Sequence, residues 1–318
     1  MSRVRKLLPL FGLLLLAWIL SRQDWSALSS AFSRLGPRPI AEAALLFSAN
    51  AALKSVRFQR MLLAQRLVLP LPVAVASYFA SLFYGQVTLG RVGELYKTEA
   101  LLERGVPLGT ALSSSLYDRL LDVALVTLLA AVLGAAVVGD ARAALAAGVV
   151  VLFLIALGVA VLRARSLASV GPIAKLRAWL DGRRGGRGLL SMLAQVVSGL
   201  DPLLRPSFLL PAMLWTAVAW AGYFGSLFCV ADGMGIHASL VALTAAAALG
   251  ALSALLPVTV SGLGAREVIY MHVLAREGVG SEQAVALSLA HLGLMTAVVI
   301  VTGSLGLLAR ARQQRRPT

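Results

Sequence analysis

Long stretches with almost no charged residue are the feature that most limits how this chain can fold. They alternate with short connectors rich in arginine and lysine. Hydrophobic residues make up 59% of the chain and charged residues 14%, against roughly 45–50% and about 25% in soluble domains. A soluble fold of 318 residues cannot bury so much apolar surface, whereas a bilayer can. The composition therefore predicts an all-α polytopic membrane protein.

The apolar stretches are the candidate membrane spans. A spanning helix needs about 20 residues, and most of the stretches approach or exceed that length. They cover Leu7–Leu20, Ile40–Leu53, Val68–Tyr84, Leu108–Val138, Ala143–Leu162, Phe208–Ala231, Ala238–Val260 and Ala284–Leu308. We expect the first to be an uncleaved helix rather than a signal peptide, because residues 21–25 form a poor cleavage site.

Basic residues indicate which ends of these stretches face the cytoplasm. They gather at the N-terminus, at Lys54–Arg66, at 163–187 and in the tail 309–318. If every stretch crossed once, the N-terminus and the 163–187 loop would lie on opposite sides. The N-terminus and the 163–187 loop lie on the same side if Val68–Glu103 and Ala238–Gly278 each enter the membrane and return to the side from which they entered. This predicts about six full spans, two re-entrant helical hairpins and cytoplasmic termini, within one membrane domain over 1–318.

Charge and cysteine content narrow the function classes. A net charge of +15 would suggest nucleic acid in a soluble protein, but here basic residues flank the spans and face anionic lipid headgroups. Cys229 is the only cysteine, and the three histidines are scattered. We therefore expect no nucleic-acid partner, no disulfide, no metal site and no cofactor.

Two glycine-rich segments lie at the tips of the predicted hairpins. Both run from Val-Thr through glycines to an arginine and a glutamate, and both end at a tyrosine. The first contains Gly90, Arg91, Gly93 and Glu94, and the second contains Gly262, Gly264, Arg266 and Glu267. This correspondence favours an inverted repeat, in which broken helices meet near the membrane midplane. The alternative is a pair of ordinary loops between spans.

Broken helices of this kind suit an anion. Glycines leave backbone N–H groups unpaired, which lipid tolerates only beside protein or a water-filled cavity. A restarting helix directs its positive end at such a cavity. Arg91 and Arg266 can add forked bonds to a phosphate. Glu94 and Glu267 can hold these arginines, or bind a cationic headgroup or a proton.

A third group of charges opens the stretch Leu108–Val138. Asp118 and Asp122 are four residues apart, hence on one helix face, and Arg119 lies beside them. Ionisable residues that lead into a span are usually functional, although acids in a first helical turn give the same pattern.

Two sets of charges nearer the chain start have simpler interpretations. Lys54 and Arg57, which follow Asn50, are interpreted as anchors that snorkel to the cytoplasmic edge. Lys97 and its charged neighbours up to Arg104 are interpreted as interfacial helix charges without a role.

In their order along the chain, these motifs resemble the lysylphosphatidylglycerol synthase transmembrane-region family, also called flippase-like domain proteins. The resemblance covers nearly the whole chain. In the family's multiple-peptide-resistance factors, such a domain moves an aminoacylated phospholipid to the outer leaflet. By this resemblance the substrate-binding residues are Asn50, Arg57, Gly90, Arg91, Gly93, Glu94, Asp118, Arg119, Asp122, Gly262, Gly264, Arg266 and Glu267.

The chain departs from the family pattern in three ways. Leu89 stands where a proline often precedes Gly-Arg, and Val260-Ser261-Gly262 stands where Pro-Gly-Gly is common. Only Ala309–Thr318 follows the last apolar stretch, so the soluble aminoacyl-transferase domain is not expected here.

The leading interpretation is a lipid translocase, not an enzyme, in the cell membrane of a bacterium or archaeon. Its substrate would be a phospholipid or polyprenyl-phosphate lipid, and its partners a second copy of the chain and a separate lipid-modifying enzyme. One alternative is a small-solute secondary transporter. Another is an intramembrane serine hydrolase, with Ser261 as nucleophile and His291 as a distant base.

Overall fold

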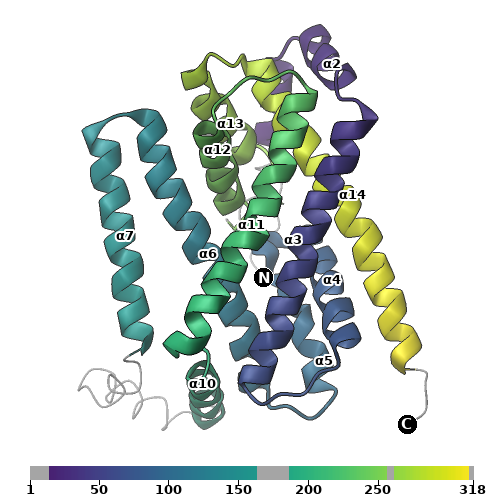
Figure 1. Cartoon of the computed structure of the whole chain (residues 1–318), viewed down its shortest axis with the longest axis vertical. Coiled ribbons are helices and arrows are strands. Elements are labelled where there is room, and N and C mark those ends of the chain that lie inside the picture. Colours follow the sequence, from purple (N-terminus) through teal and green to yellow (C-terminus); the bar gives the residue numbers. More distant parts are fainter. Residues whose placement is uncertain (1–13, 163–185, 256–260, 315–318) are drawn as a thin grey trace.

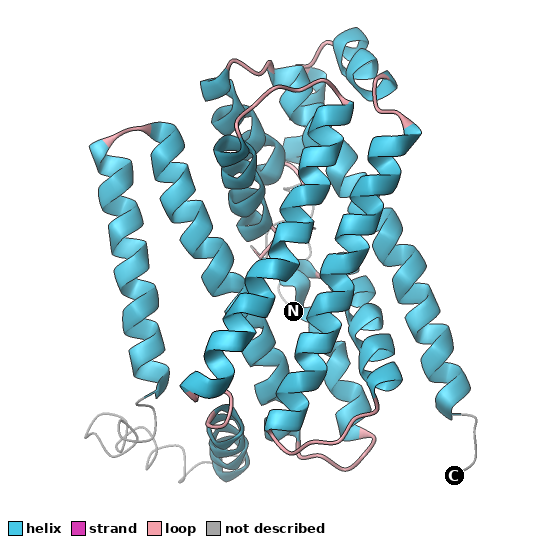
Figure 2. Cartoon of the chain, in the orientation of Figure 1, coloured by secondary structure: helices cyan, strands magenta, loops and turns pink. Residues whose placement is uncertain are grey.

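Helices account for all the regular secondary structure in the parts of the chain described by the computed structural model, which are residues 14–162, 186–255 and 261–314 (Figure 2). The prediction of an all-α protein is therefore confirmed. After a first helix over residues 14–21, the elements are α2 (Trp25–Ser33), α3 (Pro37–Ala64), α4 (Leu71–Val87), η1 (Leu89–Thr98), α5 (Glu99–Leu102), α6 (Leu108–Val138), α7 (Ala141–Leu162), α10 (Gly186–Leu200), α11 (Pro206–Gly233), α12 (Leu240–Ser253), α13 (Ala265–Leu274), η2 (Ala275–Glu277) and α14 (Ser281–Gln314).

The long helices α3, α6, α7, α11 and α14 run between the two ends of the molecule (Figure 1). Three helices among the described residues are both long and apolar enough to cross a membrane, over Leu108–Val138, Pro206–Gly233 and Ser281–Arg312. Proline at the start of α3 and α11 fits the first turn of a helix, where its missing N–H leaves no bond unmade. The count of six full spans stays a prediction.

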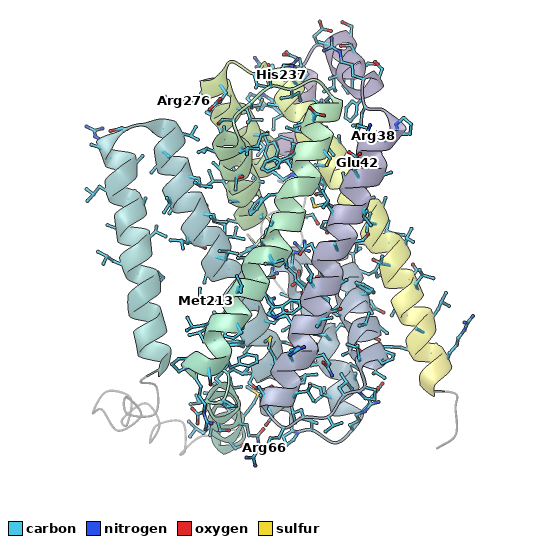
Figure 3. The ribbon with its side chains drawn as sticks, in the orientation of Figure 1. Arg38, Glu42, Arg66, Met213, His237 and Arg276 are labelled. Atoms are coloured by element: carbon cyan, nitrogen blue, oxygen red, sulfur yellow. The ribbon has the colours of Figure 1, made fainter. Side chains whose placement is uncertain are left out.

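The outer faces of these helices are apolar. Leu145 and Phe153 on α7, Leu214 on α11 and Leu305 on α14 are all exposed, and Met213 points outward from α11 (Figure 3). A soluble protein seldom exposes so much contiguous apolar surface, whereas hydrocarbon covers it without cost. The core between the helices combines large residues such as Phe58 and Tyr270 with small ones, above all the buried alanines of α12, which let helices approach closely in a membrane.

Two helical hairpins fill the space between the long helices. The first is α4 followed by η1 and α5, in the lower half of Figure 1, and the second is α12 followed by α13, in the upper half. The legs α4, α12 and α13 have 17, 14 and 10 residues, fewer than the roughly 20 that a spanning helix needs. Paired short helices thus occupy both predicted segments, 68–103 and 238–278, and their re-entry into the membrane stays a prediction.

The hairpin tips meet near the middle of the molecule. The Ser261 hydroxyl donates to the backbone oxygen of Gln86 over 3.0 Å. Opposed hairpins that meet at their tips are the arrangement an inverted repeat would produce, so the inverted repeat stays a prediction that this geometry favours.

Several predicted boundaries differ from the structure. Helix α3 continues to Ala64, so Lys54 and Arg57 lie inside a helix rather than in a connector. Helix α14 continues to Gln314, so the predicted tail from 309 begins as helix. The predicted basic loop over 163–187 lies outside the described residues up to 185, and its last two residues begin α10. Helix α2 was not predicted from the sequence.

Candidate functional site

A cavity of about 90 Å³ lies where the hairpin tips meet α3, α6, α11 and α14. Ligand pockets for small molecules usually measure about 300–1,000 Å³, so this cavity accommodates a few water molecules rather than a whole lipid headgroup. Much of its wall is apolar. The polar and charged side chains that line it are Asn50, Lys54, Tyr78, Gln86, Arg91, Glu94, Arg119, Asp122, Trp220, Tyr223, Ser261 and Arg266.

The first Gly-Arg-Glu motif forms the turn between α4 and η1. Gly90 and Arg91 both adopt left-handed backbone angles, with φ of 60° and 56°. Such a φ is uncommon for arginine and marks a constrained position. A Cβ atom on Gly93 would lie 2.3 Å from the backbone oxygen of Tyr84, so only glycine lets η1 pack this closely against α4. The motif is therefore a tight turn that aims Arg91 and Glu94 at the cavity.

Glu94 joins two arginines from different elements. Its Oε1 lies 2.8 Å from Nε of Arg91, and its Oε2 accepts a hydrogen bond of 2.7 Å from Nη1 of Arg119 on α6. The expectation that Glu94 holds Arg91 is confirmed. Arg119, placed by sequence beside the two aspartates, faces the first motif instead.

The glutamate of the second motif has a different role from that of the first. Gly262 and Gly264 adopt positive φ angles of 81° and 84°, and Gly264 precedes the first turn of α13. The carboxylate of Glu267 accepts a hydrogen bond of 2.6 Å from the Gly264 N–H and another of 2.8 Å from the Ser288 hydroxyl. Glu267 is fully buried, and it caps α13 rather than reaching the cavity.

Arg266 lines the cavity, but its guanidinium is directed at α14. Its Nε donates to the Ser288 hydroxyl over 3.0 Å, and its Nη2 donates to the Ser288 backbone oxygen. Its Nε lies 3.9 Å from Glu267, so Ser288 stands between the two charges of the motif.

A buried ion network lies beside the cavity, between α3 and α6. Arg57 donates to Asp118 over 2.6 Å and to Asp122 over 2.9 Å, and it also donates to the hydroxyl of Thr216 on α11 over 2.5 Å. Arg57 and Asp118 are each only 2% exposed. The spacing of the two aspartates lets one guanidinium contact both.

Two lysines complete the network. Lys54 contacts Asp122 over 2.8 Å, with its ammonium 4.1 Å from the centre of the Trp220 ring. Lys97 contacts Asp118 and lies 4.9 Å from the centre of the Tyr78 ring. Cations over aromatic faces gain stabilisation that grows when water is excluded.

The structure corrects three interpretations of these charges. Lys54 and Arg57 are buried and paired, so they are not snorkelling anchors. Asp118 and Asp122 lie several turns into α6, whose first turn contains no acid, so they do not serve the helix start. Lys97 has a buried partner and is not an interfacial charge. Sequence reasoning missed Lys97 because its partner is 21 residues away on another helix.

Asn50 is the remaining predicted residue that reaches the cavity. It is 4% exposed, and its Oδ1 has no hydrogen-bond partner among the described residues. Of the predicted site residues, the cavity is therefore lined by Asn50, Arg91, Glu94, Arg119, Asp122 and Arg266. The remaining predicted residues shape the turns, cap α13 or belong to the adjoining network.

The side chains considered for a serine hydrolase are engaged elsewhere. The Ser261 hydroxyl donates to the Gln86 backbone oxygen, whereas Nε2 of His291 lies 2.8 Å from the hydroxyl of Ser226. Nothing in the described geometry aligns Ser261 with His291 as a nucleophile and its base.

Comparison with known proteins gives one match. A family whose sequence model is described as "Lysylphosphatidylglycerol synthase TM region" matches residues 7–303. No curated protein and no solved structure matches the chain.

Proposed function

The chain belongs to the family of the lysylphosphatidylglycerol synthase transmembrane region, and from this premise we propose that it is a lipid translocase. The family and the apolar helices indicate a multi-pass membrane protein with a lipid-related role. The proposal adds that a phosphate-bearing headgroup, of a phospholipid or a polyprenyl phosphate, passes between the leaflets through the cavity while its tails stay in lipid.

The observation that carries the proposal is the charged cavity between the two hairpin tips. An isolated charge costs several kcal/mol or more to move into hydrocarbon. A headgroup therefore needs compensating charges partway across, and Arg91 and Arg119, which line the cavity and share the single carboxylate of Glu94, supply them. The small cavity volume implies that the hairpins must part before a headgroup enters.

In this proposal, the other predicted residues hold the cavity in shape. The turns at Gly90–Gly93 and Gly262–Gly264 place the arginines, while Asn50 lines the cavity. Arg57, Asp118 and Asp122 fix the helices around it, and Glu267 holds the second turn. We place the chain as one membrane domain in a bacterial or archaeal cell membrane, with cytoplasmic termini. A second copy or a separate lipid-modifying enzyme would be its protein partners.

Reconstitution tests the proposal. Vesicles that contain the protein and acyl-chain-labelled phosphatidylglycerol should lose inner-leaflet label to an external quencher faster than protein-free vesicles. Arg91→Ala should slow this loss by about tenfold to a hundredfold, because a charge-assisted hydrogen bond contributes about 1.5–3 kcal/mol.

Arg38→Ala is the matched control, because Arg38 forms an exposed ion pair with Glu42 near the upper end in Figure 3, and neither residue lines the cavity. Wild-type protein that moves no lipid, or an Arg91→Ala variant that matches Arg38→Ala, would contradict the proposal. Uptake of a water-soluble anion with no lipid movement would favour the small-solute transporter instead.

A further inference from the structure

The acidic groups that line the cavity are already neutralised. Glu94 lies within 2.8 Å of Arg91 and 2.7 Å of Arg119. Asp122 lies within 2.8 Å of Lys54 and 2.9 Å of Arg57, and it accepts a further hydrogen bond of 3.2 Å from the Trp220 ring N–H. Each carboxylate thus has two cationic neighbours, and neither is left to receive an ammonium group from a ligand.

The basic groups, in contrast, have donors to spare. A guanidinium carries five N–H donors. Arg119 uses Nη1 on Glu94, while its buried Nη2 has no hydrogen-bond partner among the described residues. The buried Nε of Arg91 faces Glu94 without the alignment of a hydrogen bond. These two side chains come from η1 and α6 and meet at one carboxylate, so their remaining donors lie close together.

Asn50 adds a neutral polar group to the same cavity. Its side chain is 4% exposed and without a partner for Oδ1 in the described parts of the chain. The amide O and N can exchange places by a flip of the side chain, so Asn50 can offer either a donor or an acceptor to a ligand. A buried amide oxygen without a partner is costly, and a bound hydrogen-bond donor would relieve that cost.

We infer that Arg91, Arg119 and Asn50 bind the phosphate of a lipid headgroup with net negative charge, and that the cavity rejects headgroups with a free ammonium group. This inference rests on the proposed function and names its substrate class. It separates this chain from a carrier of aminoacylated phospholipid, whose amines would meet only cations and neutralised carboxylates. Arg266 is not part of the phosphate site, because Ser288 takes its hydrogen bonds.

Glu94 then acts as the internal competitor of the substrate. Its carboxylate occupies the arginine N–H groups that a phosphate oxygen would take, and its negative charge opposes the incoming anion. Removal of that charge should tighten binding, whereas removal of either arginine charge should weaken it. A merely structural Glu94 would not produce these opposite signs.

Binding to the purified full chain in phosphatidylcholine nanodiscs tests the inference. The probes are short-chain phosphatidylglycerol, short-chain lysyl-phosphatidylglycerol and inorganic phosphate, each titrated by calorimetry. We expect phosphatidylglycerol to bind at least about tenfold more tightly than the lysyl lipid, as expected for one unfavourable charge contact, and more tightly than inorganic phosphate. Equal or tighter binding of the lysyl lipid overturns the selectivity. If inorganic phosphate binds as tightly as phosphatidylglycerol, the ligand of the site is free phosphate rather than a lipid headgroup.

Variants test which residues form the site. Arg119→Gln should weaken phosphatidylglycerol binding about tenfold to a hundredfold, and Glu94→Gln should strengthen it several-fold. Arg38→Gln removes an equivalent charge from an exposed pair and should leave binding unchanged. Melting temperatures confirm that each variant is folded, and Arg91→Gln replaces Arg119→Gln if the latter does not fold. Wild-type affinity in both arginine variants overturns the assignment.

The two proposals fail separately. Lipid movement in vesicles together with a preference for the lysyl lipid would overturn this inference and leave the translocase standing. Selective phosphatidylglycerol binding without any movement would leave the anion site standing and overturn the translocase.

Discussion

Asp118 contacts both Arg57 and Lys97 in a setting from which water is largely excluded. Its neighbour Asp122 contacts Arg57 and Lys54, so three cations depend on two carboxylates. Loss of one partner of a buried ion pair leaves an uncompensated charge and costs about 3–5 kcal/mol, whereas removal of both partners together is often nearly neutral. At the scale of single residues, the partners in this network are shared, so removal of one carboxylate leaves more than one cation without its counter-charge.

Asp118→Asn should therefore lower the free energy of unfolding by about 3–5 kcal/mol, seen as a lower melting temperature in detergent. Addition of Lys97→Met should restore part of the loss, because the charge left without a partner is removed as well. Glu42→Gln, which breaks the exposed pair with Arg38, should change stability by less than about 1 kcal/mol. A double variant no more stable than Asp118→Asn would show that the cost is not one of charge balance.

The residue scale also shows where sequence reasoning ends. The motif residues Arg91, Glu94 and Arg266 could be predicted to line a cavity, because glycines beside charges are unusual in an apolar chain. The partners of Lys54 and Lys97 could not be predicted, because they come from helices that are distant in the sequence. One signal was available: basic residues at 54 and 57 directly follow one apolar stretch and acids at 118 and 122 lie within another, and charges at membrane depth usually pair.

At the scale of elements, the two hairpins share a packing device. In each, a glycine in the first leg lies where a charged side chain of the second leg crosses it. A Cβ on Gly85 would lie 2.5 Å from Cγ of Glu94, and a Cβ on Gly250 would lie 2.9 Å from Cγ of Arg266. Both distances are shorter than real contacts allow. The glycines thus let each hairpin bury a charged side chain between its own legs.

Gly85→Ala should displace Glu94 and leave Arg91 and Arg119 without their shared partner. We expect a loss of about 1–3 kcal/mol in stability, typical of overpacking. Gly293→Ala in α14 is the matched control, because nothing lies within 4 Å of the added Cβ. That change should be neutral or stabilising by up to about 1 kcal/mol, since alanine favours helix. Equal effects of the two substitutions would refute the crossing argument.

At the scale of the whole molecule, the two ends carry different segments of the chain. Arg66 lies at the lower end in Figure 3, and Arg276 and His237 lie at the upper end. The C-terminal end of α14 and the ends of α7 and α10 that flank residues 163–185 share the lower end (Figure 1). Apolar stretches and basic clusters were enough to predict this arrangement, because hydrophobicity and positive charge act over whole segments. Helix limits inside α3 and α14 could not be predicted, since buried charges there interrupt the apolar signal.

If the lower end is cytoplasmic, a cysteine at position 66 should be labelled only from the cytoplasmic side and one at 276 only from outside. The background is Cys229→Ala, which removes the chain's only cysteine. Labelling with a membrane-impermeant maleimide in intact cells and in inverted vesicles measures both positions. The same side for both positions would refute the topology, and the reverse pattern would invert the orientation.

The contact between the hairpin tips has a consequence for thermal motion. The hydrogen bond from Ser261 to Gln86 is of a kind that contributes only about 0.5–1.5 kcal/mol, a change of roughly two- to thirteenfold in population. This hydrogen bond alone is too weak to hold the tips together against thermal fluctuations. Collective movements of helices occur within microseconds to milliseconds, which is the timescale on which separation of the tips is expected. If the chain is the proposed translocase, such spontaneous opening would let a lipid gradient alone set the direction of net flow.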